Sequence, residues 1–227
     1  MNRWIQNAVS NGRNLIEPEA WGLLADYGLP MPGYEMVENV QEAVMAAGRI
    51  GYPVVLKIVS CDVIHKSDVG GVRVGLEDAA AVKAAYTEIM SSVKSGVPDA
   101  LIEGMLVCRM LPPGGVECII GMVRDPSFGP ALMVGLGGVF VEVLKDVSFR
   151  VLPLDEENAT AMIEELKGIT LLRGIRGENP RDIKALAQIL VKVGKLVEEN
   201  PQIKELDINP CIVYETGAFP VDARILL

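Results

Sequence analysis

The sequence of 227 residues predicts an α+β protein of two subdomains, each a sheet backed by helices. Segments typical of strands and helices alternate in the first half, whereas the second half is richer in hairpins. Hydrophobic residues make up 50% of the chain, which is enough for a real core. We expect an N-terminal extension over residues 1–16, a first subdomain over 17–103 and a second over 104–227.

The first half is punctuated by helix starts and stops. Proline suits the first turn of a helix and glycine its end, so a helix is expected from Glu17-Pro18 to Gly28. A β-branched run bounded by turn residues predicts a buried strand. The further expected helices cover 41–50 and about 79–93 after an Asp78 cap, and the expected strands cover 31–37, 53–59 and 71–75.

The second half contains more turn signals between apolar runs. The segment Pro112-Pro113-Gly114-Gly115 predicts a hairpin between strands at 106–111 and 116–123. Further strands are expected at 131–134, 139–144 and 148–152, helices at 155–166 and 180–199, and a closing hairpin from strands at 206–214 and 219–225.

Composition excludes several classes of function. The net charge of −9, with no basic run, argues against a nucleic-acid partner. The longest apolar stretch, 131–144, is shorter than the roughly 20 residues that a membrane span needs. The N-terminus lacks the apolar core of a signal peptide, so a cytoplasmic protein is expected. Cys61, Cys108, Cys118 and Cys211 form no C-x-x-C pair, and we expect buried, reduced thiols rather than a zinc site.

A lysine lies midway along the apolar run 53–59. Burying a lysine is costly unless its charge is paired, so Lys57 is a candidate for binding phosphate. A lysine that reaches water from the edge of a sheet is an equally good explanation.

The single histidine of the chain, His65, follows this strand by a few residues. Imidazole is a good nucleophile near neutral pH and can accept a phosphoryl group. Lys66 and Ser67 add a charge and a hydroxyl, and the backbone at Gly70 and Gly71 can approach an anion closely. Composition alone nevertheless favours an ordinary loop histidine beside a glycine turn.

The C-terminal hairpin offers oxygen ligands. Asp207 and Asn209 share one face of a strand by period two, and Asp222 can lie opposite them on the partner strand. Such ligands suit Mg²⁺ that also holds nucleotide phosphates, while a polar sheet face in water is about as good an explanation.

Two further features carry weaker signals. The run Gly135–Gly138 resembles half of a dinucleotide fingerprint, but a strand rather than a helix is expected after it, so a turn or bulge is preferred. Glu117 follows the Pro-Pro-Gly-Gly segment and can hydrogen-bond a ribose hydroxyl.

Five runs of the chain are distinctive when taken in order: Gly51–Lys57 (GYPVVLK), Ile64–Val72 (IHKSDVGGV), Arg124–Pro130 (RDPSFGP), Gly135–Arg150 (GLGGVFVEVLKDVSFR) and Leu206–Pro210 (LDINP). Together they closely resemble the β subunits of ADP-forming acetate–CoA ligase, relatives of succinyl-CoA synthetase. The resemblance extends from about Glu17 to Ile225 and implies an ATP-grasp fold that grips ATP or ADP. It also implies the reaction acyl-CoA + ADP + phosphate ⇌ acid + CoA + ATP.

The resemblance also implies partners and residue roles. An α subunit with CoA-binding and phosphohistidine domains is expected in an α2β2 assembly, since this chain lacks a credible CoA-binding fold of its own. His65 falls on the position that relays the phosphoryl group to ADP, and Lys57 on a phosphate-binding position. Asn209 and Asp222 fall at the Mg²⁺ site, to which Asp207 is added only by its place on the same strand face, and Glu117 falls at the ribose site.

One segment departs from the family pattern. The adenine-binding segment often reads V-Q-E-M, whereas here it is Val107-Cys108-Arg109-Met110, which leaves the nucleotide preference open. Two other functions stay open as well. One is a stand-alone ATP-grasp ligase that joins a carboxylate to an amine and needs no histidine. The other is a nucleotide-binding regulatory subunit without catalysis.

Overall fold

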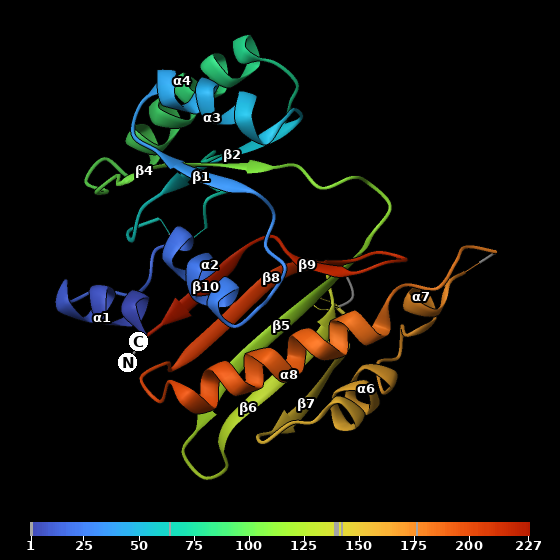
Figure 1. The fold of residues 1–227 in the computed structure, drawn as a ribbon. Coiled ribbons are helices and arrows are strands. Elements are labelled where there is room, and N and C mark those ends of the chain that lie inside the picture. The colour runs from blue at the N-terminus through green and yellow to red at the C-terminus, as the bar shows by residue number, and fades with distance from the viewer. Residues whose placement is uncertain (1, 64, 139–140, 142, 176) are drawn as a thin grey trace. The chain divides into compact units, whose positions relative to one another are not determined.

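The computed structural model describes every residue of the chain except 1, 64, 139–140, 142 and 176. The chain forms two compact units (Figure 1). The small unit comprises Pro32–Pro112, and the large unit comprises Met1–Met31 together with Pro113–Leu227. Each unit contains its own sheet covered by helices, which confirms the α+β prediction.

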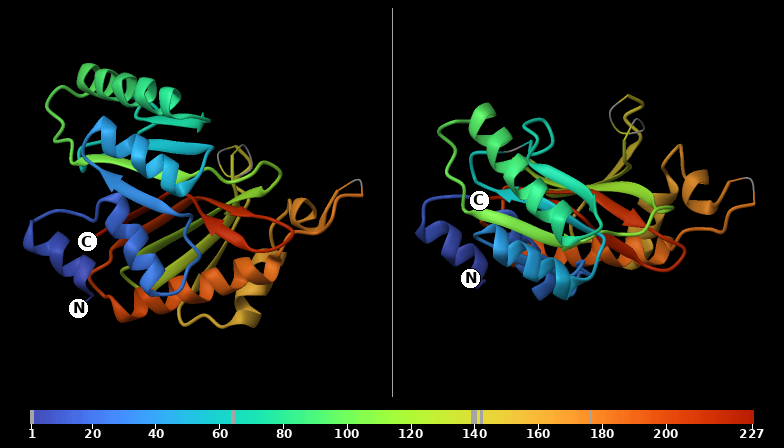
Figure 2. Two further views of the ribbon diagram at one scale, coloured as in Figure 1. Left: turned by 45° about the horizontal axis from the view of Figure 1, so that its top comes forward. Right: turned by 90° about the horizontal axis from the view of Figure 1, so that it is seen from above.

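The small unit contains a four-stranded antiparallel sheet in the order β1-β4-β2-β3. Its elements are β1 (Tyr34–Val37), α3 (Val40–Ile50), β2 (Val54–Val59), β3 (Val72–Leu76), α4 (Ala79–Gly96) and β4 (Gly104–Arg109). Both helices cover one face of the sheet (Figure 2). Asn39 and Asp78 cap them, because each side chain accepts a hydrogen bond from a backbone N–H of the first turn.

The large unit contains a six-stranded sheet in the order β10-β8-β5-β6-β7, with β9 paired to β8. Its strands are β5 (Val116–Asp125), β6 (Gly129–Leu136), β7 (Val147–Val151), β8 (Glu205–Val213), β9 (Ala218–Pro220) and β10 (Ala223–Leu226). Its helices are α1 (Arg3–Ser10), α2 (Glu17–Asp26), α6 (Glu156–Glu164), α7 (Thr170–Arg173) and α8 (Ile183–Glu199).

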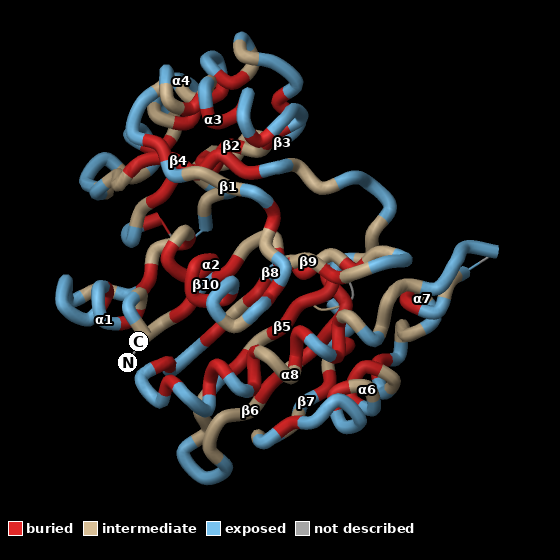
Figure 3. The backbone as a smooth tube through the Cα atoms, viewed as in Figure 1, coloured by how far each residue is buried: buried red, intermediate tan, exposed pale blue. Residues whose placement is uncertain are grey.

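Helices α6 and α8 cover one face of the large sheet (Figure 1). Figure 3 shows buried positions along the inner side of α8 and exposed positions along its outer side. At Gly194 the helix lies so close to the sheet side that an added Cβ would lie 3.1 Å from a methyl of Leu152 and 3.6 Å from one of Leu132. None of the helices in the described part of the chain is long and apolar enough to cross a bilayer.

The predicted hairpin at Pro112–Gly115 is wrong. β4 pairs with β1 and β2 in the small sheet, whereas β5 pairs with β6 and β8 in the large one. Proline and glycine favour a change of chain direction but do not determine which strands pair. The small unit consequently ends at Pro112, nine residues after the expected boundary at 103 (112 − 103), and residues 1–31 belong with the large unit rather than divide at 16.

Other differences are local. Of the expected strand over 139–144, residues 139, 140 and 142 lie outside the described part, and Val143 and Leu144 lie in a turn rather than a strand. The helices α1 and α7 were not expected. α1 has eight residues and buries only Ile5 and Ala8, and α7 has four residues, so both are too short for a window in which helical periodicity can be recognised.

Candidate functional site

Lys57 lies in the middle of β2, between β4 and β3. Leu56 and Ile58 belong to the core under α3 and α4, so Lys57 points to the opposite face of the sheet. Its side chain is only 4% exposed. The sheet-edge explanation is therefore excluded. A buried ammonium requires compensating polar or anionic groups, which is the property expected of a lysine that binds phosphate.

The residues around Lys57 on this face are mostly apolar. Leu106 is its register partner in β4, and Cys108 on the same face is 3% exposed. The Cys108 thiol donates to the carbonyl of Val55 over 3.7 Å, which keeps the sulfur against the sheet. Apolar neighbours beside one cation are compatible with a nucleotide, whose base is apolar on its faces and whose phosphates are anionic.

Arg109 turns away from this face. Its guanidinium donates to the carbonyl of Ile50 over 2.7 Å, at the end of α3, on the helix side of the sheet. A cation at a helix C-terminus is favourable, because it interacts with the last carbonyls. The departure from the family pattern at Arg109 thus has a structural role within the small unit.

The backbone of the expected adenine segment is partly engaged. The N–H of Arg109 donates to Gly33 and that of Met110 donates to Pro53, over 2.8 and 3.1 Å. These two donors are used within the small unit. Val107 belongs to the core under the helices, so its side chain also points away from the Lys57 face. Contact with a base at these positions would have to use other groups, such as backbone carbonyls.

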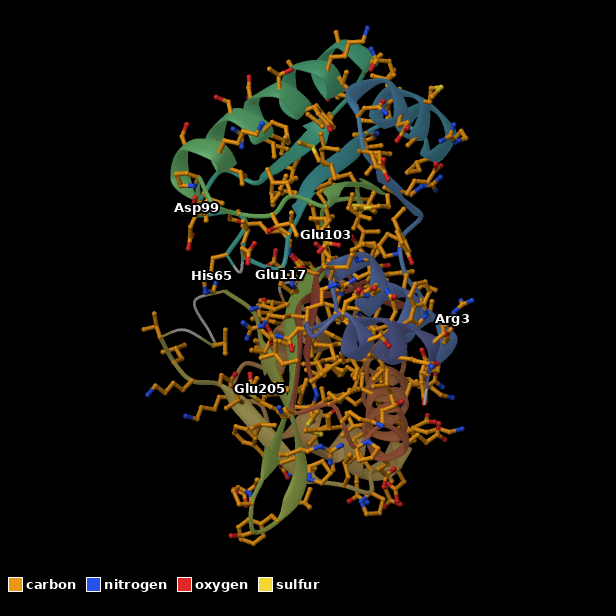
Figure 4. The ribbon with its side chains drawn as sticks, turned by 90° about the vertical axis from the view of Figure 1, so that its left-hand side faces the viewer. Arg3, His65, Asp99, Glu103, Glu117 and Glu205 are labelled. Atoms are coloured by element: carbon orange, nitrogen blue, oxygen red, sulfur yellow. The ribbon has the colours of Figure 1, made fainter. Side chains whose placement is uncertain are left out.

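His65 lies in the loop between β2 and β3 and is exposed. Figure 4 shows its side chain in the open at the end of this loop. The loop is fixed on both sides of it: Val63 is buried in the core under the helices, and Val69 packs against the same core. Between these anchors Ser67 and Asp68 are exposed and Lys66 is half-buried. The histidine therefore extends from a short segment whose ends are held.

The two glycines of this loop form the turn that closes it. The N–H of Gly70 donates to Ser67 and that of Gly71 to Lys66, over 3.2 and 2.6 Å. A Cβ at Gly71 would lie 2.7 Å from a methyl of Ile58, and Gly70 has a φ of +68°. The expected cradle of N–H groups for an anion is thus engaged within the turn, and the need for glycine comes from packing and backbone conformation.

Asn209 and Asp222 meet across the C-terminal hairpin, as the alternation predicted. The N–H of Asn209 donates to the carbonyl of Asp222 over 3.1 Å. Ile208, next in β8, is fully buried, so Asn209 points to the face of the large sheet that α8 does not cover. An amide and a carboxylate oxygen from two residues with bonded backbones fit Mg²⁺, which takes few protein oxygens and fills its shell with water and phosphate.

Asp207 lies two residues further along the same face and pairs in register with Arg224. Burial raises the pKa of the Asp207 carboxyl, Arg224 opposes this rise, and the nearby charge of Asp222 adds to it. Asp207 is thus placed to balance Arg224. Among the described residues, no group of three His, Cys, Asp or Glu side chains is arranged to hold a metal ion.

Glu117 lies at the start of β5, on the uncovered face, and is exposed. Its carbonyl accepts from the N–H of Gly137 over 2.7 Å, and a Cβ at Gly137 would lie 2.9 Å from that of Glu117. The Gly135–Gly138 run therefore allows close approach of two strand ends. The structure places Glu117, Asn209 and Asp207 on the sheet of the large unit and Asp222 directly before β10 of that sheet. Lys57, Lys66, Ser67 and His65 lie in the small unit.

Asp146 was missed by the sequence argument. It is 3% exposed, and its carboxylate accepts from the N–H groups of Lys167 and Gly168 over 2.7 and 2.8 Å. It anchors the end of the connection between β6 and β7 against the segment after α6. No sequence signal distinguishes this buried carboxylate, since Lys145 directly precedes it and Glu142 lies in the same run.

Comparisons with known proteins agree with this geometry. A family model described as an ATP-grasp domain matches residues 7–227. Subunit beta of acetate–CoA ligase [ADP-forming] I from Pyrococcus furiosus is 52% identical over 98% of this chain and 96% of its own length. The chain belongs to the ATP-grasp family, in the group of ADP-forming acetate–CoA ligase β subunits.

Other relatives of this ATP-grasp chain are longer. Acetate–CoA ligase [ADP-forming] I from Archaeoglobus fulgidus is 47% identical, and the match covers 98% of this chain but 32% of that protein. A solved structure of acetyl-coenzyme A synthetase 1 from Ca. Korarchaeum cryptofilum with coenzyme A and Ca-AMPCP has a TM-score of 0.96 and 51% identity, over 98% of this chain and 97% of that one.

Another structure of the Korarchaeum enzyme contains Mg-AMPPCP, and its phosphohistidine segment points towards the nucleotide binding site. It has a TM-score of 0.86 and 47% identity over 99% of this chain and 98% of that one. The ATP-grasp fold implied by the sequence runs is thereby confirmed.

Proposed function

We propose that this chain is the nucleotide-binding β subunit of an ADP-forming acyl-CoA synthetase. The reaction is acyl-CoA + ADP + phosphate ⇌ acid + CoA + ATP. One observation carries the proposal beyond family membership: an exposed histidine, on a loop anchored at both ends, directly follows the strand that holds the buried Lys57. A stand-alone carboxylate–amine ligase would not need this histidine.

His65 acts as a phosphoryl carrier in this proposal. In the direction of ATP use, a bond forms between an imidazole nitrogen and the γ-phosphorus of ATP, while the bond from that phosphorus to the β–γ bridging oxygen breaks and ADP leaves. ATP formation reverses these changes. A histidine carrier splits one difficult transfer into two, and the carrier has to reach two sites. A short exposed segment with fixed ends suits that task.

The remaining residues supply charge and position. We assign Lys57, with Lys66 and Ser67, to the phosphates, and Glu117 to the ribose. Asn209 and Asp222, extended by Asp207, would hold Mg²⁺, which neutralises phosphate charge when bound. Phosphoryl transfer depends mainly on positioning and charge stabilisation, so these roles account for most of the catalysis expected of this chain.

A partner α subunit is part of the proposal. The match covers about a third of the Archaeoglobus protein, so the other two-thirds of that chain lies outside it. We expect this part to correspond to a separate α subunit with CoA-binding and phosphohistidine domains, in an α2β2 assembly in the cytoplasm. Co-purification of the chain from its native source checks the partner and its stoichiometry.

The acid is proposed to be selected by the partner. The chain is 52% identical to an acetate–CoA ligase subunit and 47% identical to a 4-hydroxybutyrate–CoA ligase from Nitrosopumilus maritimus. A trans-feruloyl-CoA synthase is still 36% identical. Such similar chains in enzymes for such different acids are expected if this chain handles the nucleotide and not the acid.

Labelling of the chain by γ-labelled ATP and Mg²⁺ tests the relay. We expect acid-labile, base-stable label on the wild type and none on His65→Ala, because the chain has a single histidine. Asp68→Asn, at an exposed neighbour in the same loop, is the matched control and should retain the label. Equal labelling of His65→Ala would remove the relay role from this residue. Addition of the α subunit should then give CoA-dependent ATP formation.

A further inference from the structure

Several exposed apolar side chains lie on the uncovered face of the large sheet or at its β5–β6 hairpin tip. Phe128, at the tip, is 72% exposed, and Phe149, Val151 and Val123 on the face are 55%, 49% and 48% exposed. The register joins the three residues of the face through β6, since Val123 pairs with Ala131 and Ala131 with Val151, and Met133 pairs with Phe149. We call these six residues the β5–β7 patch. A patch of this kind on one sheet face is typical of an interaction surface.

The patch borders a groove of about 340 Å³. Gly121, Met133 and Phe149 line its apolar side, and Glu205, Asp207 and Arg224 line the other. Gly121 leaves space at the bottom of the groove, because a Cβ at this position would lie 3.1 Å from the terminal methyl of Met133. An apolar centre with a charged rim is the composition of interfaces between chains that fold separately.

Phe128 lies at the tip of the β5–β6 hairpin, in a turn that is ordered by hydrogen bonds. The carboxylate of Asp125 accepts from the N–H groups of Ser127 and Phe128, over 2.7 and 2.9 Å. Gly129 has a φ of +80°, a conformation that glycine adopts without strain. Figure 3 shows the tip exposed. An aromatic side chain presented on an ordered turn loses little entropy on binding, so it is a suitable anchor for a partner.

We propose that the β5–β7 patch and its groove are the docking surface for the α subunit. This inference rests on the proposed function, which requires that partner. In the Archaeoglobus relative, 68% of the chain (100 − 32) lies outside the matched part, and that remainder has to pack against the ATP-grasp part somewhere.

Position on the sheet favours the same occupant. Asp207 borders the groove, and Asn209 follows two residues later on the same face of β8. A segment that enters along the groove therefore arrives at the candidate metal residues. In the Korarchaeum structure with Mg-AMPPCP, the phosphohistidine segment points towards the nucleotide binding site. A partner that delivers such a segment has to approach this face, and the β5–β7 patch provides an apolar contact surface for it next to the groove.

The test measures binding of the α subunit of the same source, purified alone, to variants of this chain by titration calorimetry. Phe128→Asp and Phe149→Asp should each weaken binding at least about tenfold, as loss of an interface anchor does. Leu101→Asp is the matched control, since Leu101 is 71% exposed in the small unit, and it should bind like the wild type. Wild-type affinity in both phenylalanine variants would overturn the docking proposal.

Labelling of His65 by ATP without the α subunit separates the two proposals. The phenylalanine variants should label like the wild type, because the patch takes no part in that step. If a phenylalanine variant fails to fold, Glu205→Lys provides the test, since Glu205 is an exposed residue that lines the groove. Its side chain is labelled in Figure 4. This substitution should weaken binding several-fold at low salt, and unchanged binding would overturn the docking proposal.

Two further outcomes would also overturn the docking proposal. The first is a wild-type homodimer that Phe128→Asp dissociates while the affinity for the α subunit stays the same, which would make the patch a self-interface. The second is a wild-type chain that neither labels at His65 nor binds the α subunit, which would remove the proposed function together with the docking surface. Loss of α binding with intact labelling supports both.

Discussion

The His65 loop of the small unit and the Asn209–Asp222 hairpin of the large unit hold their polar groups in different ways. The loop is fixed by buried Val63 and by the Gly71 turn, and His65 between them is exposed. In the hairpin, the backbone of Asn209 in β8 is bonded to that of Asp222, which directly precedes β10. A group that has to reach two sites benefits from a segment held only at its ends, whereas a metal site needs ligands on rigid elements.

The largest effect on phosphoryl transfer is expected from substitution of Lys57. This residue lies in the small unit, but, like Asn209, it belongs to a strand inside a sheet. Lys57→Met should lower the rate of phosphoryl transfer about 10²–10³-fold, the range seen when one charge-stabilising group is removed. The free energy of unfolding should fall, because removal of one member of a buried charged interaction leaves the other member without its partner. Single-turnover labelling and urea unfolding measure the two quantities.

The control for this change is Lys83→Met, at an exposed lysine on α4. It should leave both the transfer rate and the unfolding free energy near their wild-type values. A Lys57→Met variant that transfers at the wild-type rate would show that the buried ammonium has a structural role only.

The next effect is expected in the hairpin. Asp222→Asn keeps the shape of the side chain but removes its charge, so the Mg²⁺ concentration for half-maximal labelling should rise by about 10–100-fold or more. Loss of a metal's supporting group alone has an effect of that size. Glu157→Gln, an exposed carboxylate on α6, is the control and should leave the Mg²⁺ requirement unchanged. An unchanged Mg²⁺ requirement in Asp222→Asn would place the metal elsewhere.

Much of this architecture followed from local sequence signals. The strand with Lys57 is a β-branched run between turn residues, and β2 covers Val54–Val59. The opposition of Asn209 and Asp222 followed from period two and one turn. The reduced state of the cysteines was also expected, although Cys61 is exposed rather than buried.

Features that depend on tertiary contacts were not predictable in this way. The pairing of β4 with β2 rather than with β5 is a long-range choice that the proline–glycine segment does not encode. The direction of Arg109 depends on the end of α3 beside it, and the engaged amide of Gly71 depends on how the loop closes. Such contacts involve residues far apart in sequence, where periodicity gives no signal.

A smaller effect is expected from adding one methyl group to the loop. Gly71→Ala brings a Cβ to 2.7 Å from Ile58 and 3.0 Å from the carbonyl of Lys66, so the turn that anchors the His65 segment has to shift. Overpacking of this kind costs about 1–3 kcal/mol of unfolding free energy. The rate of His65 labelling should fall as well, because the segment loses its fixed end.

Gly48→Ala, in the same unit, should change the free energy of unfolding in the opposite direction. Gly48 lies inside α3 with no atom within 4 Å of an added Cβ, so alanine should stabilise the helix by about 0.5–1 kcal/mol. Urea unfolding of both variants measures the difference. If Gly71→Ala is as stable as the wild type, the loop is not closed by the tight packing described above.

The last prediction concerns the reactivity of the cysteine thiols in the two regions, and it requires no substitution in the protein. Cys61 is exposed at the start of the His65 loop, whereas Cys118 and Cys211 are register partners buried between β5 and β8. Burial raises the pKa of the Cys118 thiol to about 12 and also raises that of Cys211.

The thiolate is the reactive form, so at mildly alkaline pH the buried pair should not react with an alkylating reagent while Cys61 does. Mass spectrometry of the native protein should therefore find the modification at Cys61, and unfolding in urea should expose the other thiols. Rapid modification of Cys118 or Cys211 in the native protein would mean that the sheet carrying Asn209 opens more readily than the loop carrying His65, which would reverse the contrast between the two regions.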